Sequence, residues 1–164
     1  QNKLLLYNLR LSYLSAAVIR QQLANLAQRV TDGRLNHDYL AGVIAQSPHI
    51  RVPDALPSSD RAPDSIQFKL TDLTDDQVHA FVKAAAAAGV KVQVFGLSDD
   101  NARAFWNWQF IPDLPDLPRT RAMLMRACDV RLPVRLKQSA LDEVADVLLQ
   151  AVAAVTEAPR FYGT

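Results

Sequence analysis

Apolar residues recur at helical spacing through the first 48 residues of the chain. A helix is predicted over residues 12–30, where Ser12 is a good N-cap because its hydroxyl can accept from a free backbone N–H of the first turn. Gly33 is expected to interrupt the helix, and a second helix is expected to end at Ser47 and Pro48. The apolar faces of these helices consist of Ile19, Leu23, Leu26 and Val30, and of Leu35, Tyr39, Leu40, Val43 and Ile44.

After a proline-rich loop at residues 49–64, the apolar residues recur at every second position instead of at helical spacing. Residues 66–70 alternate between apolar and polar side chains, which predicts a half-buried strand. Thr74 to Gln77 form a capping box at the start of a helix, and Gly89 is placed where such a helix commonly ends. Residues 90–94 alternate again. The region therefore predicts a strand, a helix and a second strand.

A long loop at residues 96–118 separates this unit from the end of the chain. A short helix is expected at about residues 119–126, followed by a third strand whose apolar positions begin at Val130. Pro133 cannot donate to a strand partner, so this strand either lies at an edge or ends early. The final helix is expected to start at Ser139 as its N-cap.

Three short strands and four or five helices predict an α+β fold. We expect a short three-stranded sheet covered by helices and preceded by a long helix and a second helix. The predicted division is a helical interdomain or dimer segment at residues 1–48 and an α+β domain at residues 49–164. The apolar faces of the early helices need a partner surface from another domain or subunit.

Composition narrows the classes of protein that the chain can represent. The 164 residues are 49% hydrophobic, which allows a buried core, and the net charge of +1 argues against a general polyanion binder. The chain has no apolar run long enough to span a membrane and no recognisable signal peptide. The single cysteine, Cys128, fits a reducing cytoplasm. The chain opens without Met and among leucines, which favours a start within a longer protein.

The motifs of several enzyme classes are absent from the sequence. His37, His49 and His79 lack the spacing of zinc ligands, and there is no P-loop, dinucleotide glycine fingerprint or nucleophile elbow. The acid pairs at residues 75–76 and 99–100 are interpreted as helix-start or loop residues. Taken alone, the chain looks like a domain that assists chemistry.

Basic residues gather between positions 119 and 137, with Asp129 as the only acid. They allow a nucleic-acid face, but no aromatic stacking platform is interleaved, so a solvated or salt-bridged face is favoured and no nucleic-acid partner is expected. The basic residues are Arg119, Arg121, Arg126, Arg131, Arg135 and Lys137.

Asn8 and Arg10 immediately precede the first predicted helix. Their polar groups beside a helix start suit the binding of an anion or of another chain's ligand. On local pattern alone, the simpler interpretation is that Asn8 caps a turn and Arg10 is solvated. Both interpretations remain open at this point.

Three segments carry a family resemblance through their order and spacing. They are residues 7–12 with the helix behind them, residues 64–70 followed by a helix, Gly89 and a strand, and residues 131–134 followed by the terminal helix. Together they resemble the C-terminal domain of fold-type-I pyridoxal-phosphate (PLP) aminotransferases of the DegT/DnrJ, sugar-aminotransferase-like family. In the first segment, Leu6 replaces a family Gly and Leu9 a family aromatic residue.

The resemblance implies a cofactor role for Asn8 and Arg10. In the family, the Asn of this element reaches across a dimer to the PLP phosphate of the neighbouring subunit, and Arg10 matches the family's Arg. The family's Schiff-base Lys lies upstream of this element. The resemblance therefore implies a C-terminal fragment that is not catalytic alone, a missing N-terminal PLP-binding domain and a homodimer. From composition we expect a cytoplasmic protein with no membrane partner.

The long loop contains residues that suit an amino acceptor. Arg103 can grip a carboxylate or phosphate, and Trp106 or Trp108 can stack on a ring or sugar face. The simpler alternative is that both tryptophans close the core of the domain and that Arg103 pairs with Asp99 or Asp100. A free-standing α+β ligand-binding or interaction module is the alternative to the whole aminotransferase hypothesis.

Overall fold

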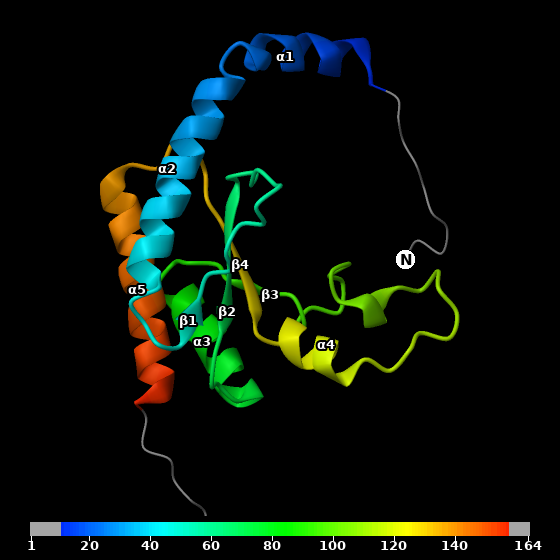
Figure 1. The fold of residues 1–164 in the computed structure, drawn as a ribbon, viewed down its shortest axis with the longest axis vertical. Helices are drawn as coiled ribbons and strands as arrows, with labels where there is room; N and C mark the ends of the chain where they lie inside the picture. The colour runs from blue at the N-terminus through cyan, green and yellow to red at the C-terminus, as the bar shows by residue number, and fades with distance from the viewer. Residues whose placement is uncertain (1–10, 158–164) are drawn as a thin grey trace, which may run out of the picture.

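The computed structural model describes residues 11–157, in which helices cover one face of a small antiparallel sheet (Figure 1). The α+β fold predicted from the sequence is confirmed. The elements in chain order are α1 (Tyr13–Leu23), α2 (Leu26–Ile44), β1 (Ile50–Arg51), β2 (Ser65–Leu70), α3 (Asp75–Ala87), β3 (Gln93–Val94), the 3-10 turn η1 (Phe105–Asn107), α4 (Pro118–Leu124), β4 (Ala127–Arg131) and α5 (Gln138–Thr156).

The sheet has the strand order β1-β2-β4-β3, and all neighbouring strands are antiparallel. Because β2 and β3 both run against β4, they are parallel to each other, and α3 connects them. The expected three-stranded sheet is corrected to four strands, since Ile50 pairs with Leu70. The extra strand, β1, has two residues, which is too short to show a periodic pattern.

The core lies between the sheet and the helices α2, α3 and α5. The apolar residues of β2 are buried against this layer, and Phe68 meets Phe81 of α3 edge to face with ring centroids 6.5 Å apart. Leu40 of α2 and Leu148 of α5 are fully buried in the same core. Residues on alternate positions of β2 and β4 face the other side of the sheet, which no helix of this layer covers.

The predicted break at Gly33 is wrong. The helix axis breaks at Ala24 and Asn25, between α1 and α2, and Gly33 lies inside α2. Ser12 is the N-cap of α1 as expected, and its hydroxyl accepts from the Ser15 N–H at 3.0 Å. Gly33 is buried, which indicates that packing rather than helix termination explains the glycine.

Two other helix starts can be compared with the sequence. The Thr74–Gln77 capping box is present, with Thr74 N–H donating to Gln77 Oε1 at 2.9 Å. The last helix starts earlier than expected, with Lys137 rather than Ser139 at its N-cap position. β4 begins at Ala127, three residues before the predicted Val130, and ends at Arg131, before Pro133; it lies between β2 and β3 and not at an edge, so of the two alternatives only the early end holds.

The helices α1 and α2 differ in their packing. α2 contacts the core through Leu40 and Ile44, and on the surface its Tyr39 Oη donates to Asp142 Oδ1 of α5 at 2.6 Å. α1 projects away from the sheet, and none of its residues is buried (Figure 1). Within the described part of the chain, no helix is both long and apolar enough to cross a membrane. The division at residue 48 stays a prediction.

Candidate functional site

The long loop between β3 and α4 is held at its first residue. The Gly96 N–H donates to the Leu124 carbonyl at 2.9 Å, and a Cβ built on Gly96 would lie 2.8 Å from the Met125 backbone nitrogen. Since real Cβ atoms do not approach backbone that closely, a glycine is required for this contact. The loop therefore starts in a fixed position against the end of α4.

Side-chain amides fold the loop back on itself. Asn107 Nδ2 donates to the carbonyls of Ser98 and Asn101, at 2.8 and 3.0 Å. Asn101 Oδ1 accepts from the Arg103 N–H at 2.9 Å, and Trp108 Nε1 donates to the Ala102 carbonyl at 2.6 Å. These bonds replace the regular pairing that an irregular segment lacks, so the loop presents its aromatic side chains in a defined arrangement.

Cationic and aromatic side chains stack in pairs around this loop. The Arg103 guanidinium lies 4.5 Å from the Phe95 ring centroid, and the Arg121 guanidinium lies 4.1 Å from that of Trp106. Trp108 stacks on Phe110 with centroids 6.1 Å apart. Both tryptophans are half-buried and lie outside the main core.

The alternative ion pair of Arg103 is not formed. Among residues 11–157, no salt bridge joins Arg103 to Asp99 or Asp100. Its charged group is instead placed over an aromatic face, which leaves the N–H groups at its edge available to an oxygen ligand.

Arg103 and Trp108 share one cavity, and Trp106 is not part of it. This apolar cavity, about 380 Å³ in volume, lies between the loop and α4. Its walls are almost entirely hydrocarbon, so it suits an apolar or ring-shaped group. The lining residues are Arg103, Phe105, Trp108, Ile111, Leu114, Pro115, Leu117, Thr120 and Leu124.

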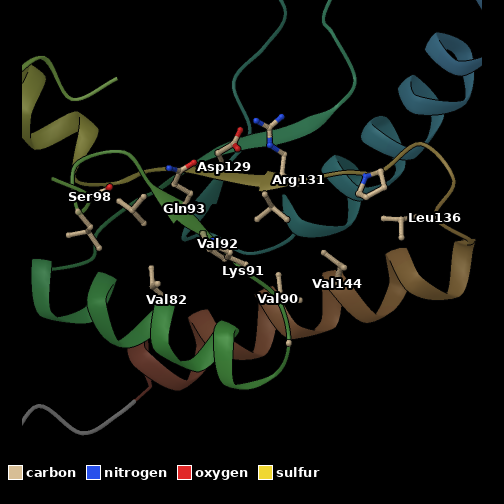
Figure 2. A pocket seen from close by; sticks show the side chains of 15 residues that line it. Val82, Val90, Lys91, Val92, Gln93, Ser98, Asp129, Arg131, Leu136 and Val144 are labelled. Atoms are coloured by element: carbon tan, nitrogen blue, oxygen red, sulfur yellow. The ribbon is translucent and has the colours of Figure 1, made fainter. Parts of the chain in front are cut away.

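A larger cavity of about 690 Å³ lies beside β3 and β4, above α3 and α5 (Figure 2). Figure 2 shows Val82 of α3 and Val144 of α5 facing it, whereas Asp129 and Arg131 are directed away from those helices. The cavity is thus lined by valines on its helix side and bordered by charged side chains on the far side of β4.

Asp129 is the buried charged residue that the sequence did not single out. It is 3% exposed and lies between Gln67 and Gln93 in the cross-strand register. Within residues 11–157, its Oδ1 has no hydrogen-bond partner, and neither does the buried Asn101 Nδ2. A buried polar atom without a hydrogen bond is costly, so these two atoms are unfavourable features of the described fold.

The cofactor residues expected from the sequence, Asn8 and Arg10, lie outside the described residues. The lysines that the structure does describe are all exposed: Lys69, Lys83, Lys91 and Lys137. Among the described residues, no cluster of His, Cys, Asp or Glu suits a metal ion.

Comparisons with known proteins match most of the chain. A model of the DegT/DnrJ/EryC1/StrS aminotransferase family matches residues 1–149. Among solved structures, 3-amino-5-hydroxybenzoic acid (AHBA) synthase matches 90% of this chain with a TM-score of 0.68 and 22% sequence identity, which shows likeness of fold. The match covers 40% of that chain, so the present chain spans less than half its length. No curated protein matches the sequence.

Proposed function

The chain belongs to the DegT/DnrJ/EryC1/StrS aminotransferase family, and on that basis we propose that it is the C-terminal part of a PLP-dependent aminotransferase. The family match over residues 1–149 carries this proposal. When bound, PLP supplies the electron sink through which an amino group moves from a donor to an acceptor. The chain supplies the small domain, dimer contacts and part of the substrate entrance.

The reactive amine comes from a preceding PLP-binding domain. Each described lysine is exposed, whereas a lysine that forms a Schiff base with PLP is placed in an enclosed, desolvated site. The coverage of 40% of the AHBA synthase chain supports a larger protein of which this is one portion. The chain alone is therefore proposed to be inactive.

Arg103 and Trp108 bind the amino acceptor at the substrate entrance. The apolar cavity beside α4 takes the ring or hydrocarbon body of the acceptor, and Trp108 packs against it. Arg103, placed over Phe95, holds a carboxylate or phosphate of the same molecule. Trp106 lies outside this cavity and contributes by holding Arg121 of α4.

Asn8 and Arg10 contact the PLP phosphate of a neighbouring subunit, which makes the working unit a homodimer. The exposed apolar side chains of α1 support a subunit or domain contact in this region, because such a surface is unfavourable in water. The exposed apolar side chains of α1 are Leu14, Val18, Ile19 and Leu23.

The buried, unbridged Cys128 is compatible with a cytoplasmic protein.

Absorbance of the intact protein tests the cofactor assignment. The purified protein is expected to show the visible band of enzyme-bound PLP, which disappears on reduction with borohydride. Asn8→Ala should weaken PLP binding by about 1.5–3 kcal/mol, the value of a hydrogen bond to a charged group. Gln28→Ala, an exposed change on α2, should leave it unaltered. An intact protein without a PLP band contradicts the proposal, and unchanged PLP retention in the Asn8 variant removes Asn8 from the site.

A further inference from the structure

Arg61 and Arg103 come from separate loops and line one cavity. The cavity has a volume of about 510 Å³ and lies beside β2, on the face of the sheet that is opposite the helices. Ser65 and Gln67 of β2 line it. The side chains of Ser59 and His37 complete its polar wall. Its volume is ample for a small anion or for the anionic end of a larger molecule.

A buried histidine orients Arg61. Arg61 Nη1 lies 3.4 Å from His37 Nε2, and Arg61 Nη2 donates to the Pro53 carbonyl. A guanidinium can only donate, so His37 Nε2 is the acceptor and Nδ1 carries the proton, which it donates to Asp38 Oδ1 at 3.1 Å. His37 is 7% exposed, so this chain of bonds holds the guanidinium from a fixed position.

Within the part of the chain that the structure describes, the positive charges of Arg61 and Arg103 have no carboxylate partner. Arg61 contacts a carbonyl and an imidazole nitrogen, neither of which is a carboxylate, and Arg103 rests on the Phe95 ring. No ion pair of either residue occurs within residues 11–157. Two cations held without a counterion beside one cavity create a favourable potential for an anion.

The other charged residues of the cavity leave a positive balance. Asp64 pairs with Arg131 at 2.7 Å, so these two charges offset each other. Asp54 is the remaining acid in the wall, against the guanidinium groups of Arg61 and Arg103, which form no ion pair within residues 11–157. The hydroxyls of Ser59 and Ser65 and the amide of Gln67 add hydrogen-bond donors.

We infer that this cavity binds an oxyanion, with Arg61 and Arg103 as its ligands and His37 as the residue that positions Arg61. A planar guanidinium donates two parallel N–H bonds to the oxygens of a phosphate or carboxylate, which suits this arrangement. Identification of that anion as part of the acceptor rests on the proposed function. Anion binding itself does not, because none of these residues belongs to the proposed PLP contacts.

Calorimetric titration of the intact protein with inorganic phosphate and with acetate tests the inference. Saturable binding of one or both is expected, and a preference for phosphate would identify a phosphorylated rather than a carboxylate ligand. Arg61→Gln and Arg103→Gln should each weaken binding at least about tenfold, as loss of a charge-assisted hydrogen bond implies. Arg61→Lys should retain part of the affinity, and Arg119→Gln, an exposed change on α4, should retain all of it.

His37→Ala separates positioning from charge. It should weaken phosphate binding although it removes no cation, whereas Asp38→Asn should have a smaller effect because an amide oxygen still accepts from His37 Nδ1. The absence of saturable binding, or equal binding by the wild type and both arginine-to-glutamine variants, overturns the inference. If PLP is bound but phosphate and acetate are not, the anion site fails and the aminotransferase assignment stands. If phosphate or acetate binds but PLP does not, the anion site stands and the aminotransferase assignment fails.

Discussion

Gly33 of α2 packs directly against Pro63 of the loop that precedes β2. A Cβ built on Gly33 would lie 2.7 Å from Pro63 Cγ and 3.0 Å from the Pro63 carbonyl oxygen. The loop thus crosses α2 at a glycine, which has no side chain. Pro63, the residue at this crossing, follows Arg61 by two positions. This contact fixes the loop that carries Arg61 to the helix that carries His37.

Gly33→Ala is expected to destabilise the protein despite the higher helix propensity of alanine. Propensity favours alanine by about 1 kcal/mol, but the added methyl group must displace Pro63 or the helix, and overpacking typically costs about 1–3 kcal/mol. Gly42→Ala is a matched control in the same helix, because a Cβ there meets nothing within 4 Å. Urea unfolding should show a lower stability for the first variant and an unchanged or higher stability for the second. A stabilising Gly33→Ala contradicts the packing argument.

Gln77→Glu is expected to destabilise the protein although glutamate is a common capping-box residue. Gln77 Oε1 accepts from the Thr74 N–H, and its Nε2 donates to the Val155 carbonyl of α5 at 2.8 Å. A glutamate keeps the first bond and replaces the second by a contact between two acceptors. We expect a loss of about 1 kcal/mol in the free energy of unfolding, with Asp76→Glu as an exposed control. Equal stability of both variants would show that the bond to α5 contributes nothing.

Cys128 is expected to resist thiol reagents in the folded protein. Burial raises the pKa of the Cys128 thiol far above its ordinary value, so almost no thiolate is present at neutral pH. Because the unfolded thiol loses its proton near pH 8.5 and the folded one does not, the folded state becomes less stable as pH rises above about 8.5. Labelling with Ellman's reagent should be slow in buffer and fast in urea. Rapid labelling of the folded protein contradicts the burial of this residue.

The parts of the fold that were predicted correctly depend on residues close in sequence. The alternation in Ser65–Leu70 and the capping box at Thr74 each depend on contacts within a few residues, so their patterns identify a strand and a helix start directly. β1 has no such pattern, because Ile50 and Arg51 become a strand only by pairing with β2. Gly33 carries no local signal of its role, because the residue that it packs against, Pro63, lies 30 positions away.

The candidate sites depend on contacts between distant segments. Residue type alone indicates Arg103 and Trp108, but their shared cavity also needs Leu124 of α4. Arg61 and His37 gave no signal in sequence, since one stands in a proline-rich loop and the other on a helix, and only the fold joins them. Asp129 appears as an isolated acid among basic residues until the sheet register places it between Gln67 and Gln93.

Trp108→Ala is expected to impair acceptor binding more than Trp106→Ala does. Trp108 lines the apolar cavity, donates to the Ala102 carbonyl and stacks on Phe110, whereas Trp106 packs under Arg121 outside the cavity. Loss of the half-buried Trp108 ring as a surface that the acceptor would cover corresponds to about 1.5–3 kcal/mol, so KM for the acceptor should rise roughly tenfold or more. The half-reaction with the amino donor, followed through the PLP spectrum, should change little in both variants. A rise in KM in Trp106→Ala alone would show that the acceptor contacts the side of the loop where Trp106 meets Arg121.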